Sequence, residues 1–272
     1  SFFDFFNGDY TQNAVFEAAH ADANVNLLAY TFAFGNGITA TLSIEDPSTS
    51  DDGGRRNTLG GAGGPAGWAP YGGVHTPDLV ANVNISQAWG SAQIMGALHE
   101  NTTWMHGVNG KIGWAVGAGV KVNLPALGPT TQVALQAAYS KGALAYVSPS
   151  IDGITTGVVT GGYSNDFEVA GGSIRQNTAW GVAAGFTHGL TKTLTANLEA
   201  SYLKGTLDGA LANDATLTQY DIIANVSWAP VAGLAITPEL EYRNVNYSSV
   251  INAAGQSDAS ALIGVLRVRR TF

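Results

Sequence analysis

The chain has 272 residues, of which 45% are hydrophobic and 12% charged, with a formal net charge of −8 and no cysteine. The negative charge excludes a typical nucleic-acid binding protein, because phosphates are bound by clustered Lys and Arg side chains. The absence of cysteine excludes disulfides and thiolate metal sites. No apolar run reaches the length of about 20 residues that a membrane-spanning helix needs.

Alternation of apolar and polar residues predicts about eleven β-strands, and the abundance of glycine, 35 of 272 residues, also favours strands and turns. A segment of about 10 residues with this alternation is long enough to cross an outer membrane as a tilted strand. In chain order the predicted strands are residues 24–34, 38–46, 78–88, 91–100, 111–123, 131–141, 178–188, 192–204, 217–228, 234–247 and 259–272.

The connectors alternate between short and long. The short ones are residues 35–37, 89–91, 124–130, 189–191 and 229–233, and the long ones are 47–77, 101–110, 142–177, 205–216 and 248–258. This asymmetry is typical of a transmembrane antiparallel up-and-down β-barrel with short periplasmic turns and long external loops. Within the third long connector, 143–147 and 154–160 have the pattern of a small hairpin, but the surrounding Ser, Gly, Asn and Asp favour an elaborated loop.

Aromatic residues gather near both ends of the predicted strands, where a barrel needs two girdles at the membrane interfaces. The core of a soluble β-sandwich is the alternative, but a sandwich core does not separate its connectors by length. The aromatic residues are Trp89, Trp228, Phe32, Phe34, Phe186 and Phe272 at the short-turn end, and Tyr139, Trp180, Tyr202, Tyr220 and Tyr242 at the long-loop end.

The last predicted strand, 259–272, puts Leu262 and Leu266 on one face and Arg267 and Arg269 on the other. An Arg facing hydrocarbon near the bilayer midplane costs about 2–4 kcal/mol, so both guanidinium groups are expected to face a wet lumen. Eleven antiparallel strands would leave the first and last strands parallel where they meet. The chain is therefore not expected to close a barrel by itself, although a complete smaller barrel of about twelve strands is the alternative.

Several segments resemble, in order, the general porins of alphaproteobacteria. They are residues 1–5 (Ser-Phe-Phe-Asp-Phe), 34–43 (Phe-Gly-Asn-Gly-Ile-Thr-Ala-Thr-Leu-Ser), 76–82 with 87–93, 236–242 (Ile-Thr-Pro-Glu-Leu-Glu-Tyr) and 266–272 (Leu-Arg-Val-Arg-Arg-Thr-Phe). The resemblance implies a trimeric porin whose barrel has sixteen strands and an internal third loop. It begins near the end of the fifth strand of that pattern, so this chain resembles the C-terminal portion of a porin.

The resemblance further implies a single porin domain over 1–272, with an internal constriction loop at 1–23 and membrane strands, turns and loops over 24–272. The loop would supply acidic groups to a pore constriction, and the opposite wall would supply basic ones, which together set a transverse field. Cross-strand ion pairs within the wall are the alternative for the residues on 234–247. The candidate residues of the constriction are Asp4, Asp9, Glu17, Glu239, Glu241, Arg243, Arg267 and Arg269.

No residues indicate a reaction. Glu239 and Glu241 have the spacing of any two neighbours on one strand face, so they are not expected to form a catalytic pair. Nucleotide-binding and nucleophile motifs are absent from the sequence, and residues 51–56 (Asp-Asp-Gly-Gly-Arg-Arg) are expected to be a turn rather than an ion site. The five histidines lack metal-ligand spacing and are expected to be solvated loop or rim residues: His20, His75, His99, His106 and His188.

The sequence therefore predicts an outer-membrane porin that passes small hydrophilic solutes and ions by passive diffusion, without catalysis, cofactor or metal. The expected partners are outer-membrane lipids and lipopolysaccharide, a homotrimer of the same chain, and the solutes. The alternatives are a plugged structural or adhesin barrel, and a barrel hydrolase. A plugged barrel requires large inward residues, whereas Gly113, Ala115, Gly117 and Gly119, with Gly181, Ala183 and Gly185, are small. Such positions either leave room or mark close packing of the internal loop.

Overall fold

The computed structural model describes residues 1–5, 10–11, 24–48, 71–148, 165–207, 215–248 and 258–271. Eleven strands form one antiparallel sheet in the order β1-β2-β3-β4-β5-β6-β9-β10-β11-β12-β13, and β7 and β8 form a separate hairpin. The elements are β1 (Leu27–Gly35), β2 (Ile38–Glu45), β3 (Asp78–Gln87), β4 (Gly90–Asn101), β5 (Lys111–Asn123), β6 (Gln132–Lys141), the 3₁₀ helix η1 (Leu144–Tyr146), β7 (Phe167–Ala170), β8 (Ser173–Gln176), β9 (Thr178–Gly189), β10 (Leu194–Leu207), β11 (Ala215–Val231), β12 (Leu234–Tyr247) and β13 (Asp258–Arg270).

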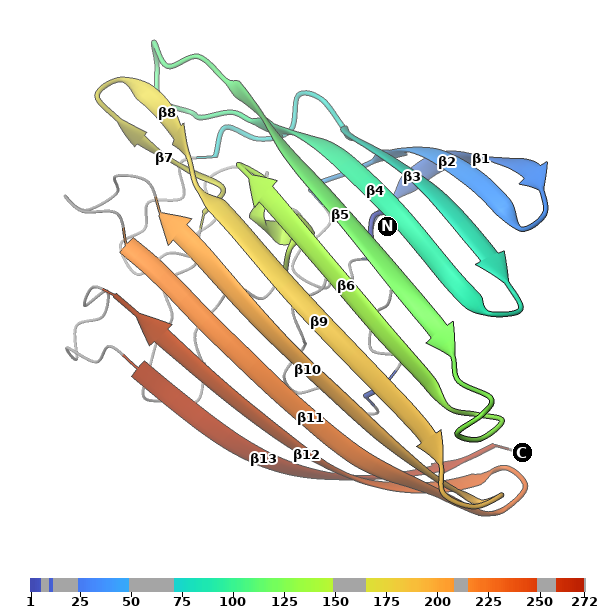
Figure 1. Ribbon diagram of the computed structural model, residues 1–272. Coiled ribbons are helices and arrows are strands. Elements are labelled where there is room, and N and C mark those ends of the chain that lie inside the picture. Colours follow the sequence, from blue (N-terminus) through green and yellow to red (C-terminus); the bar gives the residue numbers. More distant parts are fainter. Residues whose placement is uncertain are drawn as a thin grey trace.

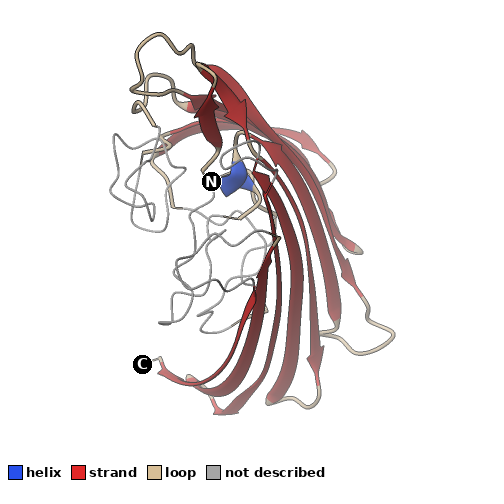
Figure 2. Ribbon diagram, turned by 90° about the vertical axis from the view of Figure 1, so that its left-hand side faces the viewer, coloured by secondary structure: helices blue, strands red, loops and turns tan. Residues whose placement is uncertain are grey.

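The large sheet is strongly curved, and it has a concave and a convex face (Figure 2). The N-terminal residues and η1 lie on the concave side (Figure 2). β1 and β13 occupy the two edges of the sheet, and among the described strands they pair only with β2 and β12. The expectation that this chain does not close a barrel by itself is therefore confirmed for the part of the chain that the structure describes.

Side chains alternate between the two faces along each strand, as period-2 patterning requires. On β12, Glu239 and Glu241 are 2% and 0% exposed on the concave face, whereas Leu240 between them is 59% exposed on the convex face. Leu262 and Leu266 on β13 are also convex and exposed. The predicted inward and outward sets on these strands are confirmed.

The tight turns lie at one end of the sheet, along the right-hand side of Figure 1, and the strand ends that the long connectors join lie at the other end. The turn between β1 and β2 has positive φ at three successive residues, Gly35 (87°), Asn36 (50°) and Gly37 (75°). Glycine and asparagine adopt this conformation most readily, and a Cβ on Gly37 would lie 1.9 Å from the Ser86 carbonyl oxygen. The separation of short and long connectors predicted from the sequence is thus confirmed.

The connector between β6 and β9 differs from its predicted detail. Residues 143–147 do not form a strand, because Leu144–Tyr146 is a 3₁₀ turn. A hairpin does occur, but it is formed by β7 and β8, and residues 154–160 lie outside the described part of the chain. The helix η1 is only 3 residues long, and no helix in the described ranges is long and apolar enough to cross a membrane.

Aromatic rings form a belt on the convex face near the long-loop ends of the strands. Three contacts join rings of neighbouring strands, at centroid distances of 5.4 Å for Trp114–Tyr139, 5.2 Å for Trp180–Tyr202 and 5.9 Å for Tyr220–Tyr242. At the other end, Phe32, Phe34, Trp89 and Trp228 are exposed. Both predicted aromatic groups therefore have the expected positions, except Phe272, which lies outside the described residues.

Candidate functional site

The concave face carries a row of polar side chains that hold the backbone of the N-terminal residues. The Phe2 amide donates to Oε1 of Glu45 on β2 (3.0 Å), and Nδ2 of Asn82 on β3 donates to the Phe2 carbonyl (2.6 Å). Nε2 of Gln93 on β4 donates to the Asp4 carbonyl (3.1 Å). Residues 1–4 therefore run across three successive strands.

The same segment is held further along the sheet by β6 and β11. Oε1 of Gln136 on β6 accepts from the Phe5 amide (3.0 Å), and its Nε2 donates to Oδ1 of Asp4 (2.8 Å). Nδ2 of Asn225 on β11 donates to the Tyr10 carbonyl (2.8 Å). Buried backbone groups need such partners, and here the wall supplies them with side chains instead of a strand ladder. We call residues 1–5 and 10–11 the inner segment.

Two glycines of the wall make room for aromatic rings of the inner segment. A Cβ on Gly119 of β5 would lie 2.2 Å from Cδ1 of Phe5, and a Cβ on Gly185 of β9 would lie 2.1 Å from Cδ2 of Tyr10. Any other residue would have to displace these rings. The predicted role of the small inward residues, as marks of close packing by an internal segment, is confirmed at these positions.

Of the three predicted acidic groups at the start of the chain, only Asp4 lies within the described residues, and its carboxylate contacts Gln136 on β6. Asp9 and Glu17 lie outside them. Asp4 is thus attached to the middle of the sheet, several strands away from β12 and β13, which carry the predicted basic groups.

The predicted residues on β12 all face the concave side, and they belong to a buried polar cluster. Arg243 forms an ion pair with Asp221, its register partner on β11. Asp221 also accepts from Ser201 (3.1 Å) and Gln219 (3.0 Å), and Glu239 accepts from Asn225 (2.9 Å). Asp221 was not among the candidate residues, although it occupies an inward position of a predicted strand.

The three C-terminal arginines divide between the two faces. Arg267 and Arg269 occupy concave positions of β13, and their register partners on β12 are Thr237 and Ala235. Arg270 is on the opposite face and donates to the Ala232 carbonyl at the turn (3.1 Å). Arg267 and Arg269 therefore lie at the tight-turn end of the wall, whereas Arg243 lies several residues further toward the long loops.

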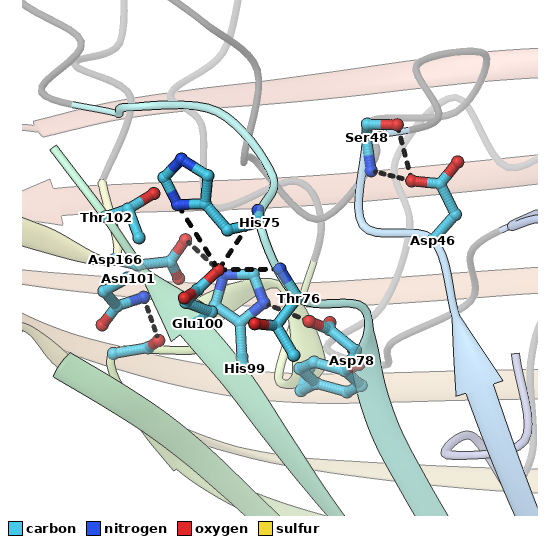
Figure 3. Close-up of polar contacts among 12 residues, drawn as sticks. Asp46, Ser48, His75, Thr76, Asp78, His99, Glu100, Asn101, Thr102 and Asp166 are labelled. Carbon is cyan, nitrogen blue, oxygen red and sulfur yellow. Dashed lines mark hydrogen bonds and ion pairs between the residues drawn. The ribbon is translucent and has the colours of Figure 1, made fainter. Parts of the chain in front are cut away.

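A second buried polar cluster ties connectors to the wall at the long-loop end (Figure 3). Nδ1 of His99 on β4 is 2.8 Å from Oδ1 of Asp78 on β3, and its Nε2 is 3.8 Å from Oδ2 of Asp166. Tyr146 of η1 donates to Asp78 (2.6 Å), and Tyr71 donates to Asp166 (2.8 Å). We call these five residues the loop clasp.

The loop clasp corrects one sequence-based expectation. His99 was expected to be solvated, but it is 2% exposed, because η1 and Asp166 fold back over the wall at this point. His75 and His106 are solvent-exposed as expected, and His20 lies outside the described residues. In the described ranges no group of three or more potential ligands is arranged to hold a metal ion.

Two carboxyl groups of the connectors have shifted pKa values. Hydrogen bonds from the Ser48 hydroxyl and amide lower the pKa of Asp46, just after β2 (Figure 3). Burial raises the pKa of Glu168 on β7, and a hydrogen bond from Asn165 acts in the opposite direction.

The concave face thus combines neutral polar groups, paired charges and a peptide segment fixed across it, whereas the convex face is apolar. Such a surface is compatible with water and hydrated solutes, and the inner segment lies across it. It does not present the convergence of nucleophile, base and oxyanion donors that covalent catalysis requires, as far as the described residues extend.

Comparisons with known proteins agree with this arrangement. A family model described as the porin subfamily matches residues 1–263. The outer membrane channel DcaP of Acinetobacter baumannii has a similar fold, with a TM-score of 0.67 and 18% sequence identity; the match covers 91% of this chain and 62% of that one. This chain therefore spans less than two thirds of the DcaP chain.

A structure described as the NanC porin matches with a TM-score of 0.36 and 12% identity, over 90% of this chain and 92% of that one. This value is too low to bear on the fold. A search of curated proteins finds no match.

Proposed function

Because the chain belongs to the porin subfamily, we propose that it forms most of the wall of a water-filled channel in the bacterial outer membrane. The channel passes small hydrophilic solutes and ions by passive diffusion. The observation that best supports this proposal is the contrast between the two faces of the curved sheet. The convex face is apolar with aromatic belts, as a lipid-facing barrel wall requires, and the concave face is polar, as a water-filled lumen requires.

Within this proposal, the strands span the membrane, with tight turns in the periplasm and long connectors outside. Closure requires strands beyond the eleven described, between the edges β1 and β13. The resemblance to alphaproteobacterial porins supports a barrel of sixteen strands and a homotrimer, in contact with outer-membrane lipids and lipopolysaccharide. The share of the DcaP chain that is matched, 62%, also supports a longer barrel, because it leaves room for additional strands.

The inner segment forms the constriction of the proposed channel, together with the remaining residues of 1–23. The supporting observation is a set of hydrogen bonds between the backbone of the inner segment and wall side chains, in which Glu45 and Gln136 accept and Asn82, Gln93 and Asn225 donate. Several side-chain bonds of about 1 kcal/mol each would make such a constriction rigid, so that it filters continuously instead of opening and closing.

Reconstitution of the full-length protein in planar lipid bilayers tests the proposal. We expect discrete, long-lived conductance steps, and swelling of proteoliposomes in small sugars but not in large oligosaccharides. Protein refolded from the Gln136→Ala variant should conduct with larger current noise, because Asp4 and Phe5 lose their two hydrogen bonds to Gln136 of β6. The variant Leu135→Ala, which shortens a convex neighbour, controls for strand damage. A folded protein without conductance would instead support a plugged structural barrel.

A further inference from the structure

We infer that the charge of the concave wall changes along the strands. A cationic band at the tight-turn end makes the ion current of the proposed channel depend on the sign of the voltage. The band consists of Lys121, Arg267 and Arg269. The inference rests on the proposed function, but it assigns the band a role in the voltage dependence of the current, which a field across a constriction does not include.

The cations of the band all lie near the tight-turn ends of their strands. Lys121 lies near the end of β5, with its Nζ 5.9 Å from the centroid of the Phe5 ring, and Arg267 and Arg269 lie near the end of β13. Other concave residues near the tight-turn ends of the described strands are uncharged, and they include Thr39, Asn84, Ser91, Gln132, Thr187, Thr195, Ser227 and Thr237.

The carboxylates of the wall lie farther from the tight turns along their strands and continue to the long-loop end. Glu239 lies two residues beyond Thr237 on β12, and it is followed by Glu241. The acidic concave residues among the described strands are Glu45, Asp78, Glu199, Asp221, Glu239 and Glu241. On the described strands, three basic residues share this part of the wall: His99, Lys111 and Arg243. On β12 and β13 the sign of the wall charge therefore changes between Thr237, which pairs with Arg267, and Glu239.

This order of charges has a physical consequence for ion flow. Fixed charges beside a narrow, low-dielectric passage concentrate counter-ions locally, and buried charges are screened less than exposed ones. Anions therefore accumulate near the band and cations near the acidic levels. A voltage of one sign draws anions and cations away from each other and out of the channel, which lowers the current. The opposite voltage drives them toward each other inside the channel, which raises it, so the current depends on the sign of the voltage.

Current–voltage curves of oriented single channels test the inference, with the full-length protein added from one side in symmetric KCl. At about 0.01 M salt, where the screening length is about 30 Å, we expect unequal currents at equal positive and negative voltages. The ratio should approach about one at 1 M, where that length is about 3 Å. The double variant Arg267→Gln with Arg269→Gln should lose the asymmetry at low salt.

The variant Arg270→Gln is the matched control, because it removes the same charge from the neighbouring position on the convex face. It should retain the current asymmetry of the original protein. A shift in electrophoretic mobility on heating verifies that every variant folds. Symmetric currents at low salt in the original protein, or equal effects of the concave and convex substitutions, would overturn the inference. Both results leave the proposed function intact, because that function fails only if no channel forms.

Discussion

Arg243 and Asp221 occupy directly paired positions on β12 and β11, and they form an ion pair on the concave wall where both side chains are almost fully buried. The charge of Arg243 is thus offset within the wall. A basic group expected from the sequence to face the acidic segment therefore contributes little to a field across the lumen.

The variant Asp221→Asn should destabilise the protein, because removal of one partner leaves a buried charge uncompensated. Such losses amount to about 3–5 kcal/mol. Urea unfolding in detergent, followed by tryptophan fluorescence, measures the change. The double variant Asp221→Asn with Arg243→Gln should recover part of the loss, and Asp258→Asn, an exposed site on β13, should have little effect. An unchanged midpoint for Asp221→Asn would argue that the pair does not form in the membrane.

The variant Gly185→Ala should displace the inner segment, since the new methyl group would overlap the Tyr10 ring at 2.1 Å. Overpacking of this kind costs about 1–3 kcal/mol and should alter single-channel conductance. Gly96→Ala is the control: this convex glycine of β4 has its nearest neighbour, the Ala115 carbonyl oxygen, at 3.7 Å. Equal conductance in Gly185→Ala and the original protein would contradict the placement of Tyr10 on β9.

The variant His99→Leu should loosen the connectors, because Asp78 and Asp166 would face each other without the imidazole. We expect faster protease cleavage at the β7–β8 hairpin, measured on intact cells. His75→Asn should not change the cleavage rate, because the His75 side chain is 65% exposed and lies 3.9 Å from Glu100. Cleavage at the tight turns of intact cells would reverse the proposed orientation of the barrel.

The pH dependence of the β7–β8 hairpin should reflect Glu168. Burial raises the pKa of this carboxyl in the folded hairpin, so folding favours its protonated form. The resulting stabilisation is present below the unfolded-state pKa and is lost as pH rises through the higher folded-state pKa. The protection factors of the hairpin amides, which correct for the intrinsic exchange rate, should therefore be larger at pH 4 than at pH 7. Glu168→Gln should make exchange nearly independent of pH in this range, apart from the intrinsic chemical rate.

Strands and faces were predictable from the sequence because a strand with one apolar and one polar face repeats every two residues. The boundaries differ modestly: the strand predicted at 217–228 extends over Ala215–Val231. Gly119 and Gly185 were also identifiable as inward small residues. The sequence did not identify which aromatic rings fill the space beside them, since Phe5 and Tyr10 lie more than a hundred residues away along the chain.

The loop clasp and the Asp221 ion pair were not predictable for a related reason. Alternation gives the face of a residue but not its partner, and the burial of His99 depends on Tyr146 and Asp166, which follow it by 47 and 67 residues. The positions of Glu239, Glu241, Arg243, Arg267 and Arg269 on the concave face were predicted correctly. Their shared role in a constriction stays a prediction.

The attachment of the inner segment also affects the order of folding. The bond from Asn225 to Tyr10 joins residues 215 positions apart, and the bonds from Gln136 span 131 and 132 positions. Closing loops of this length costs entropy before the contact is made, so long-range contacts form slowly. The residues at the start of this chain therefore reach their final positions only after β6, β9 and β11 have assembled. Refolding in lipid should show recovery of the sheet by circular dichroism before recovery of native conductance.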